Sequence, residues 1–400
     1  MLTMKKFALL ILAAVLFVIS TVHAAEEIVL PPPQITADSA ILVEVSTGRV
    51  LYEKNADVVR PPASLTKMMT CIIGLERLTP DSEIVASHTA ANAEYSTLQL
   101  QRGDIVNSYD LLTGMMLVSD NGGAIAVAEN VAGSVPAFST LMNEKAREIG
   151  CTNTNFANPN GLPNVNNYST ARDMSKIAMY CMQNSKFREI VATQKMMLYW
   201  ISPVGKKELC ENTNELLYKD EKSPIHLQYN PAEITGIKTG YTNAAGGCLA
   251  ASAKRGDVEL IAIVLHSSTM DSRFDDAIRM LDYGFANVKM TRQVRKDRVE
   301  KMAFVRGGTS ATVRVGLSDD LTFPLLANED PKNLSVTYEL PKFVDAGIER
   351  GQVLGKAILK YKGEPVVTVP MVARESVAEG FSIWSTIIAL TEPFFNWTVG

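Results

Sequence analysis

Strand-like segments at the two ends of a long helical stretch constrain the fold of this chain more than any other feature. Residues 40–52 contain two apolar-rich arms around a Ser46-Thr47-Gly48 turn, which is the pattern of a β-hairpin. The next strand-like runs come much later, at residues 237–240, 247–253 and 258–266. A single sheet built from both ends would unite these runs, so we predict an α/β (α+β) domain over residues 25–290.

Helical periodicity fills the interval between the two groups of strands. Apolar residues recur at helical spacing in residues 64–78, 109–150 and 171–184, and residues 273–285 resemble a closing helix. We therefore expect a large helical insertion within the sheet domain.

The pattern changes again after residue 290. Strand-like runs at residues 311–315, 334–338, 353–361 and 365–369 alternate with turn residues. We predict a small all-β domain over residues 291–375, with the polar segment 291–298 as its linker.

The first 24 residues have the pattern of a secretory signal peptide. Lys5 and Lys6 precede an apolar run over residues 7–19, and Ala24 ends a small-residue cleavage site. The run of 13 residues is shorter than the roughly 18 residues of a membrane span. We expect an exported protein in the periplasm or at the outer face of the cytoplasmic membrane; an uncleaved N-terminal anchor is the alternative.

Charge and metal-ligand residues exclude several functional classes. The formal net charge of −4 falls to −6 without the leader, so no basic surplus favours a nucleic-acid partner. His88, His226 and His266 are isolated in the sequence, and we expect neither a metal nor a cofactor. The five cysteines form no CxxC pair, which favours buried free thiols.

Ser64 and Lys67 are the first candidates for chemistry. They share one face of a predicted helix start, where free N–H groups favour developing negative charge. A serine needs an adjacent base to become a nucleophile, and a lysine serves as that base when burial lowers its pKa. A capping serine followed by a solvated lysine is the alternative reading.

Two further short motifs follow in the chain. Ser119-Asp120-Asn121 offers a hydroxyl for proton transfer and an amide for binding a substrate amide, although a helix cap explains it equally well. Lys238-Thr239-Gly240 at a strand edge offers two groups for a carboxylate and a glycine that lets a substrate backbone approach.

These three motifs in this order resemble those of penicillin-binding proteins and class A β-lactamases. The resemblance to low-molecular-mass serine D-alanyl-D-alanine carboxypeptidases extends over nearly the whole mature chain. It rests on the segments PPASLTKMMT (61–70), NPNGLP (158–163), YSTARDM (168–174), NTNELL (212–217), GIKTGYT (236–242) and LDYGF (281–285). It implies a serine β-lactamase/DD-peptidase-like fold and hydrolysis of the terminal D-alanine from peptidoglycan stem peptides, with covalent binding of β-lactams.

The resemblance also implies a role for each matching residue. Ser64 would be the acylated nucleophile, Lys67 its general base, and Ser119 and Asn121 the proton relay and the amide-binding group. The substrate carboxylate would be bound by Lys238, Thr239 and Gly240. The backbone N–H groups of Ser64 and Tyr241 would form the oxyanion hole. Asp120 is a departure, because family members often carry glycine at this position and β-lactamases carry aspartate.

Four other functions compete with this one. A class A β-lactamase needs a glutamate in an ExxLN-type loop, and no such string lies between Asn121 and Lys238. A non-catalytic peptidoglycan-binding protein would be expected to have a broken motif, whereas all three are intact. The absence of GxSxG disfavours a Ser-His-Asp hydrolase, and the isolated histidines disfavour a zinc peptidase.

The C-terminal segment, residues 376–400, is predicted to be an amphipathic helix that associates with a membrane surface. At 100° per residue, Phe381, Trp384 and Ile387 share one half, whereas Ser382 and Ser385 lie on the other. Packing against the β domain or a partner is the alternative.

Overall fold

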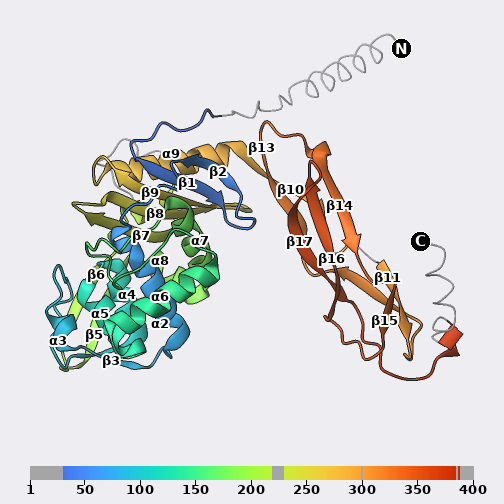
Figure 1. Cartoon of the computed structure of the whole chain (residues 1–400), viewed down its shortest axis with the longest axis horizontal. Coiled ribbons are helices and arrows are strands. Elements are labelled where there is room, and N and C mark those ends of the chain that lie inside the picture. Colours follow the sequence, from blue (N-terminus) through green and yellow to red (C-terminus); the bar gives the residue numbers. More distant parts are fainter. Residues whose placement is uncertain (1–29, 219–228, 299–300, 384–385, 388–400) are drawn as a thin grey trace, which may run out of the picture.

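The computed structural model of the 400-residue chain describes residues 30–218, 229–298, 301–383 and 386–387. Two lobes are visible in Figure 1. The first contains a five-stranded sheet covered by helices, and the second is an elongated β domain. The predicted signal peptide, residues 1–24, lies outside the described residues, as does most of the predicted C-terminal helix.

The sheet of the first lobe unites strands from both ends of the segment, as predicted. Its order is β2-β1-β9-β8-β7, and every neighbouring pair is antiparallel. Ile41 of β1 lies opposite Ile263 of β9, although 222 residues separate them along the chain. The strands are β1 (Ser39–Glu44), β2 (Val50–Lys54), β7 (Ile234–Thr242), β8 (Gly246–Arg255) and β9 (Val258–Ser267).

Both faces of this sheet are buried, because the side chains of a strand alternate between them. Ile41 and Val43 point into one apolar core, and Ala40 and Leu42 point into another. Helix α9 (Ser272–Asn287) packs on the second face. The first face carries the helices from the middle of the chain, and the active-site elements lie on this side.

The helices of the middle region begin at residues with short polar side chains. The side chains of Asn107, Asp120, Ser134, Thr170 and Asn184 each accept a backbone N–H at a helix start. The helices are α2 (Lys67–Arg77), α3 (His88–Ala91), α4 (Ser108–Leu117), α5 (Asn121–Ala132), α6 (Val135–Ile149), α7 (Ala171–Met182) and α8 (Ser185–Ala192).

A small antiparallel sheet beside these helices was not predicted. It has the order β3-β4-β5-β6, from β3 (Glu83–Val85), β4 (Ile105–Asn107), β5 (Lys195–Ser202) and β6 (Lys207–Glu211). The predicted helix over residues 64–78 also starts differently: residues Ala63–Thr66 form a 3-10 turn (η1), and α2 follows it directly.

The second lobe is the predicted all-β domain. A six-stranded sheet has the order β14-β16-β17-β12-β11-β15, and β10 pairs with β13. Its strands are β10 (Val288–Val294), β11 (Lys301–Arg306), β12 (Thr312–Leu317), β13 (Leu321–Leu326), β14 (Leu334–Glu339), β15 (Phe343–Asp345), β16 (Val353–Tyr361) and β17 (Glu364–Ala373).

The junction between the lobes differs from the prediction. Residues 291–294 belong to β10, which pairs with β13, so the first half of the predicted linker is a strand of the β domain. Arg49, beside the β1–β2 turn, contacts the second lobe: its guanidinium lies 2.5 Å from the Glu329 carboxylate and 4.9 Å from the ring centre of Phe323. This contact holds the pKa of Glu329 below its usual range, against the effect of burial.

All five cysteines are buried free thiols, as predicted. They pack as small apolar side chains, and burial raises the pKa of each. No helix among the described residues is long and apolar enough to cross a bilayer.

Candidate active site

Ser64 lies in the 3-10 turn η1, immediately before α2. Gly161 fits against this turn: a Cβ on residue 161 would lie only 1.9 Å from the Ala63 carbonyl oxygen, and its φ of +86° suits glycine. The loop that contains Gly161 therefore supports the turn that presents Ser64 to the cavity. Lys67 is the first residue of α2, and its side chain points back along the chain toward Ser64.

Lys67 is fully buried, and its amine has three polar partners. Nζ donates to Ser64 Oγ at 3.1 Å, to Asn121 Oδ1 at 2.7 Å and to the Asn160 carbonyl oxygen at 2.7 Å. All three partners are neutral. Burial lowers the pKa of Lys67 to about 7, although the nearby Asp120 carboxylate opposes this effect. A large fraction of the amine is therefore unprotonated near neutral pH and can accept the serine proton.

Ser119 and Asn121 line the same cavity, whereas Asp120 does not. The carboxylate of Asp120 caps α5 by accepting Gly123 N–H at 2.5 Å, and its other oxygen accepts Leu98 N–H at 2.8 Å. Burial raises its pKa. Asp120 is thus a buried helix cap, and the structure brings only the two outer residues of the motif to the cleft.

Strand β7 forms the opposite wall, and it is an edge strand of the sheet. Thr239 and Gly240 line the cavity. A Cβ at residue 240 would lie 3.2 Å from the Ser64 nitrogen, so glycine lets β7 approach the nucleophile. The Thr239 hydroxyl lies 2.6 Å from the Thr213 hydroxyl.

Lys238 is buried behind this wall rather than exposed at it. Its Nζ has no hydrogen-bond partner among the described residues. Burial holds the pKa of Lys238 well below its usual range, and the positive charges of Lys67 and Arg273 lower it further. A buried amine without a partner among the described residues can bind an anionic ligand or a water molecule.

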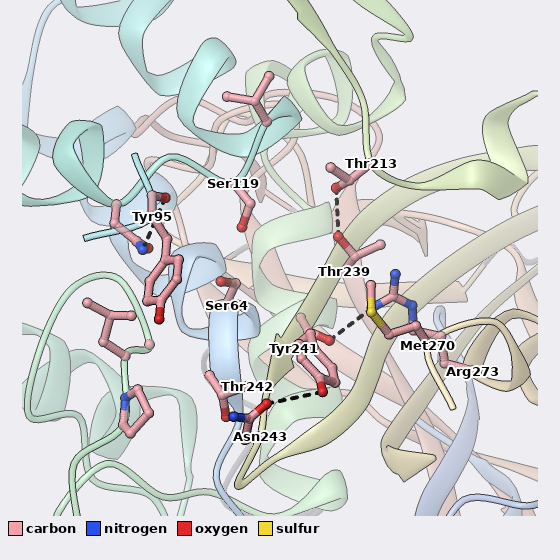
Figure 2. Close-up of a pocket in the computed structure, with 16 residues that line it drawn as sticks. Ser64, Tyr95, Ser119, Thr213, Thr239, Tyr241, Thr242, Asn243, Met270 and Arg273 are labelled. Carbon is pink, nitrogen blue, oxygen red and sulfur yellow. Dashed lines mark hydrogen bonds between the residues drawn. The ribbon is translucent and has the colours of Figure 1, made fainter. Parts of the chain in front are cut away.

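The cavity between these walls has a volume of about 450 Å³ (Figure 2). Ser64 lies between Tyr95 on one side and Thr239 with Thr213 on the other. Of the residues predicted from the sequence, Ser64, Ser119, Asn121, Thr239, Gly240 and Tyr241 line the cavity, and Lys67 and Lys238 lie directly behind its walls.

Several lining residues were not predicted from the sequence. Arg273, the second residue of α9, donates from Nη1 to the Gly240 carbonyl oxygen at 3.0 Å. Gly161, Leu162 and Thr213 lie in segments that carry the family resemblance, and that signal could have found them. No sequence signal distinguished Arg273 or Tyr95 from surface residues, because only the tertiary fold brings them to the cavity.

Residues 25–269 match the D-alanyl-D-alanine carboxypeptidase family, and residues 289–379 match the C-terminal domain of penicillin-binding protein 5. D-alanyl-D-alanine carboxypeptidase DacF of Bacillus subtilis is 31% identical over 368 residues, which is 90% of each chain. DacC of Escherichia coli is 30% identical, with 92% of this chain and 91% of DacC covered.

Solved structures show the same relationship. Penicillin-binding protein 5 from Haemophilus influenzae superposes with a TM-score of 0.68 at 28% identity, covering 88% of this chain and all of that one. The Streptomyces K15 DD-transpeptidase gives 0.58 at 33% identity, covering 64% of this chain and all of that one. The chain therefore belongs to the D-alanyl-D-alanine carboxypeptidase family of serine peptidases. The predicted activity, serine-type D-Ala-D-Ala carboxypeptidase, is confirmed.

The residues that line the cavity disfavour the β-lactamase alternative. Among the described residues that line it, none is an aspartate or a glutamate. A carboxylate that could activate water for rapid hydrolysis of a penicilloyl-enzyme is therefore absent from this part of the site, in agreement with the missing ExxLN-type string.

Proposed function

We propose that the enzyme releases the terminal D-alanine of peptidoglycan stem pentapeptides through an acyl-enzyme on Ser64. Unprotonated Lys67 accepts the Ser64 hydroxyl proton while Oγ attacks the carbonyl carbon of the penultimate D-alanine. The resulting oxyanion is held by the backbone N–H groups of Ser64 and Tyr241. The proton held by Lys67 passes through the hydroxyl of Ser119 to the nitrogen of the leaving D-alanine as the C–N bond breaks. Lys67 then accepts a proton from the water that attacks the ester carbonyl, and this proton returns to Ser64 Oγ as the ester C–O bond breaks.

The single observation that best supports this proposal is the environment of the Lys67 amine. Its amine is fully buried, lies 3.1 Å from Ser64 Oγ, and contacts only neutral groups. A lysine with these surroundings is a base near neutral pH, whereas a solvated or ion-paired lysine is not. The capping-serine alternative does not explain why the chain buries this amine.

The substrate carboxylate is assigned to the end of the cavity at Thr239. Two hydroxyls, of Thr213 and Thr239, lie 2.6 Å apart there, and Arg273 lies beside them (Figure 2). We assign Asn121 Oδ1, which can accept a second hydrogen bond beside the one from Lys67, to the N–H of the substrate's amide. The backbone at Gly240 is assigned to strand-like pairing with the peptide. The unpartnered Lys238 amine adds positive charge behind Thr239 when the carboxylate is bound.

We propose that β-lactams bind in the same cavity and react with the same serine. Its carboxylate would occupy the Thr239 end, and Ser64 would open the ring to give a covalent penicilloyl-enzyme. The experiment that tests both reactions is Ser64→Ala: the variant should lose labelling by benzylpenicillin and release of D-alanine. The matched control is Ser310→Ala, at an exposed serine of the β domain. Labelling of Ser64→Ala at the wild-type level would refute the assignment.

We further propose that the protein is exported and associates with a membrane through residues 376–400. The apolar leader supports export. Phe381, Ile383 and Ile387 are large apolar residues that are exposed in the described part of the C-terminal segment, which supports an interfacial anchor. The membrane surface is thus proposed as a partner alongside the stem peptide and β-lactams.

The domain boundaries also stay a proposal: signal peptide 1–24, catalytic domain 25–290, β domain 291–375 and terminal segment 376–400. The helical region between β2 and β7 is proposed to act as one insertion into the sheet domain. The start of β10 at Val288 supports moving the second boundary back to residue 287.

A further inference from the structure

Strand β6 (Lys207–Glu211) is an edge of the small sheet in the first lobe, whose order is β3-β4-β5-β6. It lies on the side of that lobe that faces away from the β domain (Figure 1). An edge strand presents backbone N–H and C=O groups that can pair with another strand. The residues of this edge therefore determine which strand can pair with it.

Alternate residues of β6 direct their backbone groups away from β5. Trp200 N–H donates to the Lys206 carbonyl oxygen, and Asn212 N–H donates to the Gln194 carbonyl oxygen. Residues that bond across an antiparallel pair alternate with residues whose backbone groups point to the other side. By this alternation, the residues of β6 that point outward are Lys207, Leu209 and Glu211. Their outward groups have no backbone partner in the described part of the chain.

The side chains of these three residues make β6 complementary to a second copy of itself. All three lie on the exposed face of the β5–β6 hairpin, with the positive Lys207 and the negative Glu211 on either side of Leu209. If two β6 strands pair antiparallel about a twofold axis at Leu209, each lysine lies opposite the glutamate of the other copy. Opposite charges at directly opposed positions of two strands favour their pairing.

The surface beside this edge is apolar, which also favours association. Met197 of β5 lies opposite Leu209, and Tyr199 lies opposite Lys207. Tyr199 is 59% exposed and Leu209 is 48% exposed. Large apolar side chains grouped on a surface are typical of an interaction site. Pairing through β6 would bring the two copies of Leu209 into contact and remove part of this surface from water.

We propose that two copies of this protein associate through antiparallel pairing of their β6 strands, which joins the two small sheets into one continuous sheet. The outward-pointing residues exchange backbone hydrogen bonds with the residues opposite them. The contact uses the same strand of both copies about a twofold axis, so it closes as a dimer. Thr213, which lines the active-site cavity, follows Glu211 by two residues, so the interface lies beside one wall of each cavity.

A disulfide at the twofold axis tests this arrangement. Opposed residues in a hydrogen-bonded antiparallel pair have Cα atoms about 5.5 Å apart, which is within the range that a disulfide spans. Leu209→Cys in the mature full-length chain should therefore give a disulfide-linked dimer under mild oxidation. All five native cysteines are buried free thiols, so the exposed thiol is the introduced one. The measurement is the yield of linked dimer on a non-reducing gel.

Lys207→Cys is the matched control on the same exposed strand. The two copies of residue 207 lie on opposite sides of the axis and are separated by about 13 Å along the strands. This separation is too long for a disulfide, so the control should give less than about a tenth of the linked dimer that Leu209→Cys gives. Equal yields from the two variants would indicate random collision and would contradict the pairing.

Reversal of charge tests the contact between Lys207 and Glu211 of the two copies. In a Leu209→Cys background, Lys207→Glu places glutamates opposite each other on both sides of the axis and should slow disulfide formation by about three- to tenfold. Addition of Glu211→Lys restores opposite charges and should bring the rate back to within about twofold of the original. Glu211 also pairs with Lys195 of its own chain, and that contact is lost in the double variant, so the recovery reports the contact between copies.

Sedimentation equilibrium of the unmodified mature chain in a density-matched detergent is an independent measurement. A dimer whose dissociation constant rises by about three- to tenfold with Lys207→Glu supports the proposal. Near-ultraviolet circular dichroism of each variant checks its folding. A chain that stays monomeric at the concentrations used for oxidation, or a dimer that Lys207→Glu leaves unchanged, would overturn the proposal.

Discussion

The side chain of Asn121 joins the lysine of the first motif to the rim of the cavity. Its Oδ1 accepts a 2.7 Å hydrogen bond from Lys67 Nζ. Its Nδ2 donates to the Glu94 carbonyl oxygen at 2.8 Å and, at 3.4 Å, to the carbonyl oxygen of Tyr95, which lines the cavity. The amide thus orients the lysine without adding a charge to it. A carboxylate in its place would hold a proton on the amine, so a neutral partner is what keeps Lys67 available as a base.

The acylation rate should depend on pH through Lys67. Because burial lowers the pKa of this amine to about 7, it is protonated and inactive as a base below that pH and unprotonated above it. The rate constant for acylation by benzylpenicillin should therefore rise with pH and reach half its limit near pH 7. Stopped-flow measurements between pH 5 and pH 9 test this profile.

Lys67→Arg is the matched variant for that experiment. It keeps the positive charge but cannot lose a proton in a protein, so acylation should fall by about a hundredfold or more and lose the rise near pH 7. Rates within about threefold of the wild type would mean that Lys67 acts only through its charge.

Lys238→Met should make the protein more stable while it weakens recognition of the substrate carboxylate. The Lys238 amine is buried without a partner among the described residues, and methionine fills similar space without that penalty. The free energy of unfolding at pH 7 should rise by about 1–3 kcal/mol. The substrate test is amidation of the terminal carboxylate, which should reduce kcat/KM far more in the wild type than in the variant.

The stabilisation that we expect from Lys238→Met should become smaller as the pH rises. The pKa of Lys238 is lowered on folding, so the unfolded chain binds more protons between the lowered value and the usual 10.5. The destabilisation by Lys238 therefore fades as pH rises toward 10.5, and the advantage of the methionine variant should be larger at pH 7 than at pH 10. Urea unfolding at the two pH values measures it. A variant less stable than the wild type at pH 7 would contradict the argument.

Gly161→Ala should disrupt the turn that presents Ser64. The added Cβ would lie 1.9 Å from the Ala63 carbonyl oxygen, so the turn or the loop must move. We expect a loss of about 3 kcal/mol or more in the free energy of unfolding and a strongly reduced acylation rate.

Gly205→Ala separates this clash from backbone strain. Gly205 has a similar φ of +89°, but nothing lies within 4 Å of the position of its Cβ. Its substitution should lose only about 1 kcal/mol and leave acylation unchanged. Equal losses in the two variants would show that strain alone, rather than the contact with Ala63, explains the result.

Removal of the C-terminal segment should release the enzyme from membranes without loss of activity on soluble substrates. The truncation belongs after Phe381, because Glu379 forms a β-bridge with Gly308, and Gly380 N–H donates to the Gly307 carbonyl oxygen. Flotation with liposomes of anionic phospholipid measures the partition. A truncated protein that still floats, or a full-length protein that does not, would contradict the interfacial anchor.

The sequence alone predicted the features that depend on short-range pattern. Strand alternation indicated the two groups of strands, and the spacing of Ser64 and Lys67 placed both on one face of a helix start. The β5–β6 hairpin was not predicted, although Met197, Tyr199 and Ile201 are exposed on β5 and Leu198 and Trp200 are buried. Apolar residues on both faces of this strand hide the alternation on which such a prediction depends.

Only the tertiary structure decided how the motifs act. Short motifs in sequence order carry no information about burial, and burial is what lowers the pKa of Lys67 and leaves Lys238 without a partner. Asp120 lies between two cleft residues in the chain yet caps a helix away from the cavity, because successive residues at a helix start point in different directions. Arg273 reaches the same cavity from a helix 33 residues beyond Gly240. Side chains distant in sequence share a low-dielectric site only once the sheet has brought both ends of the domain together, and the chemistry depends on that shared site.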